Sequence, residues 1–263
     1  MPRRLALRAV ALGYLVVILL APLTMVFYRT FEHGLHPVWQ TLSNHETVHA
    51  FEITLVAAGI AVPLNTVFGV LCALAIVRRR FRGKGLLNAF IDLPLAVSPV
   101  VVGLSLYLLY DRTGWFGPWL QGHGIQVLFA LPAIVLATIF VSVPFVAREV
   151  IPVLRELGNE QEQAAATLGA NRWQRFWRIT LPSIRWAVIY GVILTTARCL
   201  GEYGAVAVVS GRIIGKTETA TTLIDDLVQN FQNGGAYAVA VVLAAIAVLV
   251  LVLMTVTRSK EAL

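Results

Sequence analysis

Charge is scarce in this sequence: Asp, Glu, Lys and Arg together make up only 13% of its 263 residues. Soluble domains carry about 25%, so the low value excludes an ordinary water-exposed surface. Apolar residues take the place of the charged ones, because hydrophobic side chains account for 58% of the chain and its mean hydropathy is +0.77. The composition therefore predicts an integral membrane protein.

Cysteine is almost absent as well. Cys72 and Cys199 both lie in apolar runs and do not form a CxxC pair, so we expect reduced core residues without a redox or metal role. All five histidines fall in loops that we expect on the outer side, and we interpret them as ordinary solvated residues rather than metal ligands.

Six hydrophobic runs are long enough to cross a bilayer, since a helix rises ~1.5 Å per residue against a hydrocarbon core of ~30 Å. They are Ala9–Phe27, Phe51–Val77, Leu86–Tyr110, Ile125–Ala147, Trp186–Ser210 and Ala236–Thr257. No small-residue cleavage site follows the first run, which favours an uncleaved span over a signal peptide. We expect residues 1–50 to hold the first span and an outer loop, residues 51–257 a core of further spans, and residues 258–263 a cytoplasmic tail.

Basic residues are distributed unevenly among the loops that alternate along these spans. One side carries sixteen: three before the first span, five in RRRFRGKG, six from Arg148 to Arg185 and two at the C-terminus. The other side carries four, and Arg198 lies within a span. Because Lys and Arg concentrate on the cytoplasmic side, we expect both termini in the cytoplasm. Topology then accounts for the net charge of +7, so no nucleic-acid partner is expected.

Catalytic motifs are missing too. The segment SGRIIGKTET ends like a phosphate-binding loop, but three residues separate Gly211 from Gly215 where the motif has four. The segment also falls in an expected outer loop, where there is no ATP. No Ser/His/Asp set and no catalytic carboxylate pair is evident, so we expect no enzyme activity, no metal and no cofactor in this chain.

The longest expected cytoplasmic loop, about residues 155–185, contains the polar stretch EQEQAAATLGANRWQRFWRITLP. Asn159 and Asn171 each precede an acid or amide by three residues, a spacing that resembles a capping box. Two short helices are expected, with Gly169 ending the first. The second places Trp173, Phe176 and Trp177 on one side and Arg172, Arg175 and Arg178 on the other. Such an amphipathic helix suits the membrane interface or a docking partner.

This stretch resembles the EAA loop of ABC-type importer permeases. In that loop a Glu-Ala-Ala triplet leads to a glycine and, after nine intervening residues, to Ile-x-Leu-Pro. The matching positions here are Ala164, Ala165, Gly169, Ile179, Leu181 and Pro182, with Gln163 where the family usually has Glu. The resemblance implies an all-α type I permease fold whose loop forms a coupling helix for a cytoplasmic ATPase. Gln163 would remove any salt bridge that the glutamate makes.

Two further stretches, DLPLAVSPVVVGL (residues 92–104) and ARCLGEYGAVAVVSGRI (residues 197–213), resemble the sulfate and molybdate branch of these permeases. The resemblance implies a heterodimer with a second, T-type permease in the bacterial inner membrane. It also implies two ATPase subunits that bind ATP and Mg, and an external sulfate-binding protein. Sulfate or thiosulfate is the implied cargo, with a molybdate-type permease as the alternative.

The third expected span has features of a broken helix. Pro94 and Pro99 each remove a backbone donor, and Ser98 adds a hydroxyl between them. Two interpretations stay open: an element of the pathway or gate, or a kink that fits neighbouring helices. Asp92, near the cytoplasmic end of this span, is a candidate pathway residue, and a capping or interface residue is the alternative.

Arg198 and Glu202 stand four positions apart in the fifth expected span, so both side chains project from one helical face and can pair. A lone charge at the bilayer centre costs at least ~2.5–3.5 kcal/mol, so the pair is expected to face protein or a wet cavity. It is either a structural salt bridge at the interface with a partner permease, or it lines the route of a dianion. Asn65 in the second span is expected to pack or to hydrogen-bond.

Two classes of function are compatible with these features. The first is a permease subunit of an energy-coupled importer. The second is a self-contained secondary anion transporter or channel, in which Asp92, Arg198 and Glu202 would form an ion or proton relay. A purely structural membrane subunit is a third interpretation. Copurification of an ATPase and a requirement of uptake for ATP would separate the first class from the second.

Overall fold

The computed structural model describes residues 10, 12–32 and 34–259, and within these residues the chain is helical without a β-strand. Ala9 at the start of the first expected span, and residues 260–263 of the expected tail, lie outside the described residues. The described elements are η1 (Val16–Leu20), α2 (Ala21–Phe31), α3 (Leu35–Leu42), α4 (His45–Arg78), α5 (Lys84–Ala96), α6 (Pro99–Tyr110), α7 (Gly117–Gly122), α8 (Leu131–Ser142), α9 (Pro144–Glu156), α10 (Glu160–Thr167), α11 (Arg172–Arg175), η2 (Phe176–Thr180), α12 (Leu181–Leu200), α13 (Gly204–Val209), α14 (Ala220–Gln229) and α15 (Asn233–Ser259).

Five continuous helices are long and apolar enough to cross a membrane. They are Leu12–Phe31, His45–Arg78, Leu131–Glu156, Arg172–Leu200 and Asn233–Val250. The pair α5 and α6 provides a sixth span if it is counted as one, but the two halves are bent by 110°. The prediction of an all-α membrane protein with six apolar spans is therefore confirmed, with one span broken.

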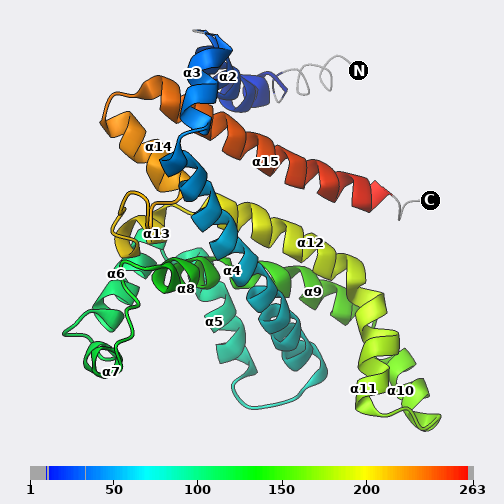
Figure 1. Cartoon of the computed structure of the whole chain (residues 1–263). Helices are drawn as coiled ribbons and strands as arrows, with labels where there is room; N and C mark the ends of the chain where they lie inside the picture. The colour runs from blue at the N-terminus through cyan, green and yellow to red at the C-terminus, as the bar shows by residue number, and fades with distance from the viewer. Residues whose placement is uncertain (1–9, 11, 33, 260–263) are drawn as a thin grey trace.

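The centre of the bundle is formed by α4, α9 and α12, which pack against one another (Figure 1). Val146 of α9 is fully buried between two glycines, Gly69 of α4 and Gly191 of α12. A Cβ atom at Gly191 would lie 2.9 Å from the Val146 Cα, so only glycine allows this approach. Small residues let membrane helices pack closely enough for dispersion to hold them together, and here they join α4 and α12 through α9.

Asn65 confirms its expected packing role. Its buried Nδ2 donates to the Ile139 carbonyl oxygen at 3.1 Å and to the Ser142 Oγ at 2.7 Å, both on α8. A polar side chain in hydrocarbon has to find a partner inside the protein. The bond therefore fixes the middle of α4 against α8.

The third expected span, residues 86–110, is two helices rather than one kinked helix. Val97 and Ser98 are extended, with ψ of 136° at both, and α6 starts afresh at Pro99. The residue before a proline is pushed out of the helical region, which explains why the chain breaks at Ser98. Pro99 stands in the first turn of α6, where its missing N–H costs no hydrogen bond.

The fourth and fifth expected spans also differ from their predicted bounds. Helix begins only at Leu131 instead of residue 125, because the chain before it is tied elsewhere: the Phe129 N–H donates to the Val209 carbonyl at 3.0 Å. The fifth span ends at Leu200, and residues 204–209 form the separate short helix α13. At its other end α12 continues without interruption through η2 into α11, as one apolar helix from Arg172.

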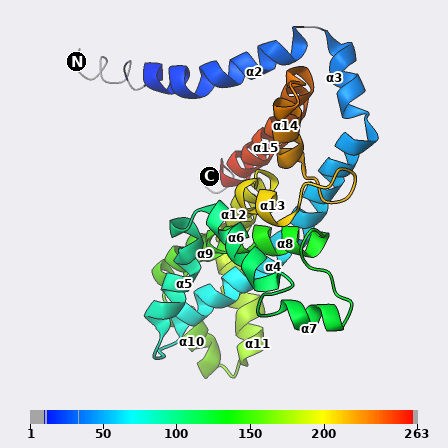
Figure 2. The same cartoon turned by 90° about the vertical axis from the view of Figure 1, so that its left-hand side faces the viewer.

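The polar loop of residues 160–180, called the coupling segment here after its expected role, lies at one end of α12. The helix breaks at Ser98 and after Leu200 lie at the other end. In Figure 1, α10 and α11 are on the right, whereas α13 and α7 are on the left. Figure 2 shows α2 at the edge of the molecule. Its main packing partner is α15. One continuous helix, α11–η2–α12, therefore connects the coupling segment to the region of the helix breaks.

Candidate coupling and translocation site

The polar loop folds into the two helices that its sequence predicts, α10 and α11. Asn171 forms the expected capping box: its Oδ1 accepts from the Gln174 N–H at 2.8 Å, and the Gln174 Oε1 accepts from the Asn171 N–H at 3.0 Å. The same expectation for Asn159 is wrong, because its side chain makes no capping bond to α10. The second helix, α11, does not end within the loop, because it continues through η2 into α12.

Gly169 ends α10 as expected. Its φ is +86°, a left-handed conformation that side chains with a Cβ rarely adopt. The turn is closed by the Ala170 N–H, which donates to the Ala165 carbonyl at 3.0 Å. Leu168, immediately before the turn, is 88% exposed. The turn thus places a large apolar side chain at the surface of the polar loop.

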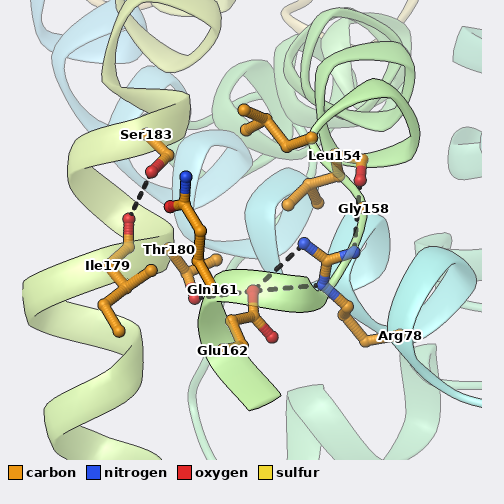
Figure 3. Close-up of a pocket in the computed structure, with 9 residues that line it drawn as sticks. Arg78, Leu154, Gly158, Gln161, Glu162, Ile179, Thr180 and Ser183 are labelled. Atoms are coloured by element: carbon orange, nitrogen blue, oxygen red, sulfur yellow. Dashed lines mark hydrogen bonds and ion pairs between the residues drawn. The ribbon is translucent and has the colours of Figure 1, made fainter. Parts of the chain in front are cut away.

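The salt bridge of this loop is made by Glu162, one residue before the position at which it was expected (Figure 3). The Glu162 Oε1 lies 3.0 Å from the Arg78 Nη2, and it accepts from the Arg78 Nε at 3.2 Å and from the Thr180 Oγ at 2.9 Å. Gln163 is exposed and makes no side-chain hydrogen bond among the described residues. The ion pair of the loop is therefore that of Glu162, and the effect of Gln163 in place of a glutamate stays a prediction.

Arg78 extends this contact into a junction of four elements. Its Nη1 donates to the Leu154 carbonyl at 3.2 Å, near the end of α9. The last residue of α4, the end of α9, α10 and the η2 turn thus meet around one carboxylate and one guanidinium. Sequence reasoning missed Arg78, Glu162 and Thr180, and the only local signal was an acid beside the Gln163 position.

We expect Glu162→Gln to reduce ATP-driven uptake about tenfold, because a loss of ~1.4 kcal/mol in the coupled state corresponds to that factor. Glutamine keeps the size of the side chain but removes the charge that balances the half-buried Arg78. Glu160→Gln is the matched control, since Glu160 begins the same helix, is exposed and forms no ion pair among the described residues. Initial uptake rates and ATPase copurification would be measured for both variants. Equal rates for the two variants would contradict the assigned junction.

The remaining residues of the coupling motif lie where the junction meets the membrane. Ile179 lines the small cavity beside Arg78 and Glu162, and Leu181 packs on the apolar core of α4 and α9. Pro182 stands in the first turn of α12, where proline is tolerated. Ala164 is exposed on α10 and Ala165 is half-buried. The motif thus divides into an outward face on α10 and an anchor at the start of α12.

Asp92 pairs with an arginine of a neighbouring helix. It forms a two-pronged ion pair with Arg148 of α9, in which the Arg148 Nε donates to the Asp92 Oδ1 at 2.6 Å. Asn88, one turn earlier, donates to the Asp92 Oδ2 at 3.3 Å. Both charged side chains remain partly exposed. The pair joins α5, the first half of the broken span, to α9, and sequence reasoning missed Arg148.

Arg198 and Glu202 are together, although they do not share one helix as predicted. Glu202 lies in the break after Leu200, and its Oε1 accepts from the Ala205 N–H at 2.9 Å, which caps α13. Its Oε2 lies 2.9 Å from the Arg198 Nη2, as an ion pair without aligned hydrogen-bond geometry. The Glu202 side chain is 2% exposed and that of Arg198 33%. Glu202 therefore belongs to the interior, and only the arginine reaches the surface.

The two broken spans meet at their breaks. A Cβ atom at Gly204, the first residue of α13, would lie 2.9 Å from the Pro99 Cβ at the start of α6. One turn further, a Cβ at Gly103 would lie 2.7 Å from the Ala205 carbonyl oxygen. Ser98 is exposed beside this contact, and Pro94 is buried in α5. Half-helices that end within a membrane are tolerated where they face protein or a wet cavity.

The segment that resembled a phosphate-binding loop, residues 210–219, forms a strap between α13 and α14. Thr217 closes it, because its Oγ donates to the Ser210 carbonyl at 2.6 Å. Arg212 pairs with Asp225 at 2.7 Å and with Asp226 at 3.1 Å on α14. Just after the strap, the Thr221 Oγ donates to the Glu202 carbonyl at 2.7 Å. The strap thus connects α14 to the break that holds Glu202.

Glu218 is the one strap carboxyl that lies wholly inside. It is 2% exposed, and its Oε2 has no hydrogen-bond partner among the described residues. Burial, together with the neighbouring carboxyl groups of Asp226 and Glu46, raises its pKa to about 7. Near neutral pH this carboxyl therefore carries a proton for much of the time.

Stability should fall as the pH rises through this range. A carboxyl whose pKa is raised by folding contributes its full stabilisation of the folded state at pH values below its pKa in the unfolded chain, here 4.5. That contribution is lost as the pH passes the pKa in the folded state, about 7.

We expect the purified complex to unfold at a lower temperature at pH 8 than at pH 5.5. In Glu218→Gln the unfolding temperature should depend less on pH. Asp111→Asn is the control, because hydrogen bonds from the Arg112 and Thr113 backbones hold the pKa of Asp111 below this window. An unchanged slope in Glu218→Gln would contradict the assignment.

Metal ligands do not gather in the described part of the chain, where no group of three His, Cys, Asp or Glu side chains could hold an ion. His45 and His49 lie one turn apart on α4 with ring centroids 6.4 Å apart. The Glu52 Oε2 lies 3.4 Å from the His49 Nδ1.

Comparison with known proteins agrees with this architecture. Residues 65–260 match the family model of the binding-protein-dependent transport system inner membrane component. The sulfate transport system permease protein CysW of Synechocystis sp. is 51% identical over 89% of this chain and 84% of its own length. The protein of that name from Escherichia coli (strain K12) is 46% identical over 88% of this chain and 80% of its own length. The sulfate transport system permease protein CysT from the same organism is 40% identical over 88% of this chain and 83% of its own length. One chain of the crystal structure of a bacterial ABC transporter involved in the import of alginate has a TM-score of 0.77 at 19% identity, covering 97% of this chain and 94% of that one.

Proposed function

The chain belongs to the family of binding-protein-dependent transport system inner membrane components, and from this premise we propose that it is a permease subunit of an ATP-driven sulfate or thiosulfate importer. It is a multi-pass membrane protein, and we place it in a bacterial cell membrane with both termini in the cytoplasm. Relatives named as sulfate permeases at 46–51% identity support the cargo.

One observation carries the mechanism: the coupling segment and the membrane break are two ends of one helix. The helix from Arg172 to Leu200 runs without interruption from the polar loop to the residue before Gly201. A displacement of α10 and α11 by a partner would therefore be transmitted along α12 to Arg198 and Glu202. The Glu162–Arg78 junction passes the same displacement to α4 and α9.

The partners follow from the two exposed ends. The outward face of α10, with Gln163, Ala164 and Leu168, is proposed to dock a cytoplasmic ATPase subunit, which would bring ATP and Mg. The half-exposed Arg148 and Arg198 are proposed to face the pathway that this chain forms with a second, T-type permease. An external binding protein would deliver the anion to the strap side.

Arg198 is the residue proposed to attract the dianion. Its guanidinium is partly exposed, while the carboxylate that balances it is buried and occupied as the cap of α13. A cation in this position lowers the cost of bringing an anion into the membrane, and its paired carboxylate weakens the attraction so that the anion can leave. Selection among sulfate, thiosulfate and molybdate is assigned mainly to the binding protein.

The test is uptake by the assembled complex in proteoliposomes. The chain would be produced with the T-type permease, the ATPase subunits and the binding protein, and entry of radiolabelled sulfate measured with ATP inside or outside. We expect uptake only when ATP reaches the ATPase, with competition by thiosulfate. Uptake driven by a proton gradient without ATP would instead support a secondary transporter, and preferential competition by molybdate would reassign the cargo.

A further inference from the structure

A cleft of about 610 Å³ opens beside the coupling segment, between the end of α4 and the α11–η2 helix. Four arginines contribute to its wall: Arg78 and Arg79 from α4, and Arg172 and Arg175 from the coupling segment. The wall also has apolar residues, among them Leu71 and Phe176. A basic surface next to an apolar one is a combination that neither the ATPase contact nor the anion pathway requires.

The charge of this cleft is not balanced within the described part of the chain. Glu162 is the only acidic residue in its wall, and it is already paired with Arg78. The Nε of Arg175 is buried and has no hydrogen-bond partner among the described residues. Arg79, Arg172 and Arg175 form no ion pair among the described residues, so the cleft is suited to an anion.

The apolar part of the cleft continues onto an exposed apolar face of α4. Leu64, Val67, Phe68 and Leu71 are all exposed large apolar residues. Their spacing of three and four residues places them on one face of α4, and Leu71 also lines the cleft. The stripe thus ends beside the arginines of the cleft. Trp177 of η2 is also exposed, and tryptophan is enriched where a membrane protein meets lipid headgroups.

We propose that this cleft binds the phosphate headgroup of an anionic phospholipid. Arg79, Arg172 and Arg175 would contact the phosphate, and the acyl chains would lie along the stripe of Leu64, Val67, Phe68 and Leu71. Basic pockets between membrane helices on the cytoplasmic side suit such headgroups. The site rests on the cytoplasmic placement of the coupling segment and is independent of the transported anion.

The lipid would add a contact between the end of α4 and the α11–η2 helix, beside the Glu162–Arg78 junction. Arg79 comes from the end of α4, whereas Arg172 and Arg175 move with α11 and α12. A bound phosphate between them would hold the coupling segment against α4 by charge. Transport by the complex would then depend on the content of anionic lipid in the membrane.

Native mass spectrometry of the purified complex tests the site directly. Phosphatidylglycerol and phosphatidylcholine would each be titrated into the complex with the wild-type chain, with the double variant Arg172→Gln/Arg175→Gln, and with Arg178→Gln. Arg178 is the matched control, since it lies on the same segment, is exposed and is not part of the cleft. A basic side chain near an anionic surface contributes roughly a factor of five in affinity, so the double variant should bind phosphatidylglycerol roughly 30-fold more weakly and Arg178→Gln as tightly as wild type.

Three results would overturn the proposal. Equal binding of phosphatidylglycerol by all three proteins would mean that the arginines do not hold a lipid. Binding of inorganic phosphate at the same affinity, with the same loss in the double variant, would make the cleft a site for a free anion. Loss of the ATPase subunits without a change in lipid binding would assign these arginines to the ATPase. If the double variant fails to assemble, Arg79→Gln on α4 tests the same site, with a weakening of roughly fivefold expected.

Discussion

Glu202→Gln is expected to leave the complex assembled but to slow sulfate uptake by about tenfold or more. Glutamine retains the oxygen that accepts from the Ala205 N–H, so α13 keeps its cap. The substitution removes the charge that lies 2.9 Å from the Arg198 guanidinium. An arginine freed of its carboxylate holds an anion more tightly, and a tenfold slower release requires only ~1.4 kcal/mol of added attraction.

The measurements are the yield of assembled complex, the maximal uptake rate and the apparent KM for sulfate. A lower rate together with a lower KM supports the pathway role of the pair. Failure to assemble would favour the structural alternative, because removing one partner of a buried ion pair costs about 3–5 kcal/mol. An intact complex that transports at the wild-type rate would contradict both interpretations.

Gly169→Val is expected to abolish uptake while the protein remains in the membrane. A Cβ at this position would meet no atom within 4 Å, so the effect comes from the backbone rather than from crowding. A β-branched residue at φ +86° is a strained outlier, and the turn that presents Leu168 and the end of α10 would rearrange. The helices buried in the membrane do not depend on this turn, so insertion should be normal.

Gly169→Asn provides the control for this experiment. Asparagine is among the few residues that enter the left-handed region readily, so this variant should keep most of the uptake. Membrane abundance, copurified ATPase and uptake rate would be measured side by side for the two variants. Normal uptake by Gly169→Val with undiminished ATPase association would remove the assignment of this loop as the coupling element.

Predictions from local sequence were most successful where the signal spans one or two helical turns. The capping box at Asn171 and the left-handed Gly169 both depend on residues within six positions, and both were expected. Asn65 was expected to bond because a buried amide in a membrane has few alternatives. Pro94, Ser98 and Pro99 marked the third span as a broken helix, but the end of the fifth span was not found, since hydropathy continues through Gly201 although the helix does not.

Sequence by itself determined that this chain lives in a membrane, where its apolar spans lie, and which polar loop stands apart from them, because each of these depends on composition and on spacing along the chain. Only the tertiary structure decided which charges meet. Glu162 pairs with Arg78 across 84 residues and Asp92 with Arg148 across 56, and nothing in either sequence neighbourhood specifies these partners. Ion pairs in a membrane are set by which helix faces pack together, so the junction, the meeting of the two breaks and the basic cleft arise from the packing of α4, α9 and α12.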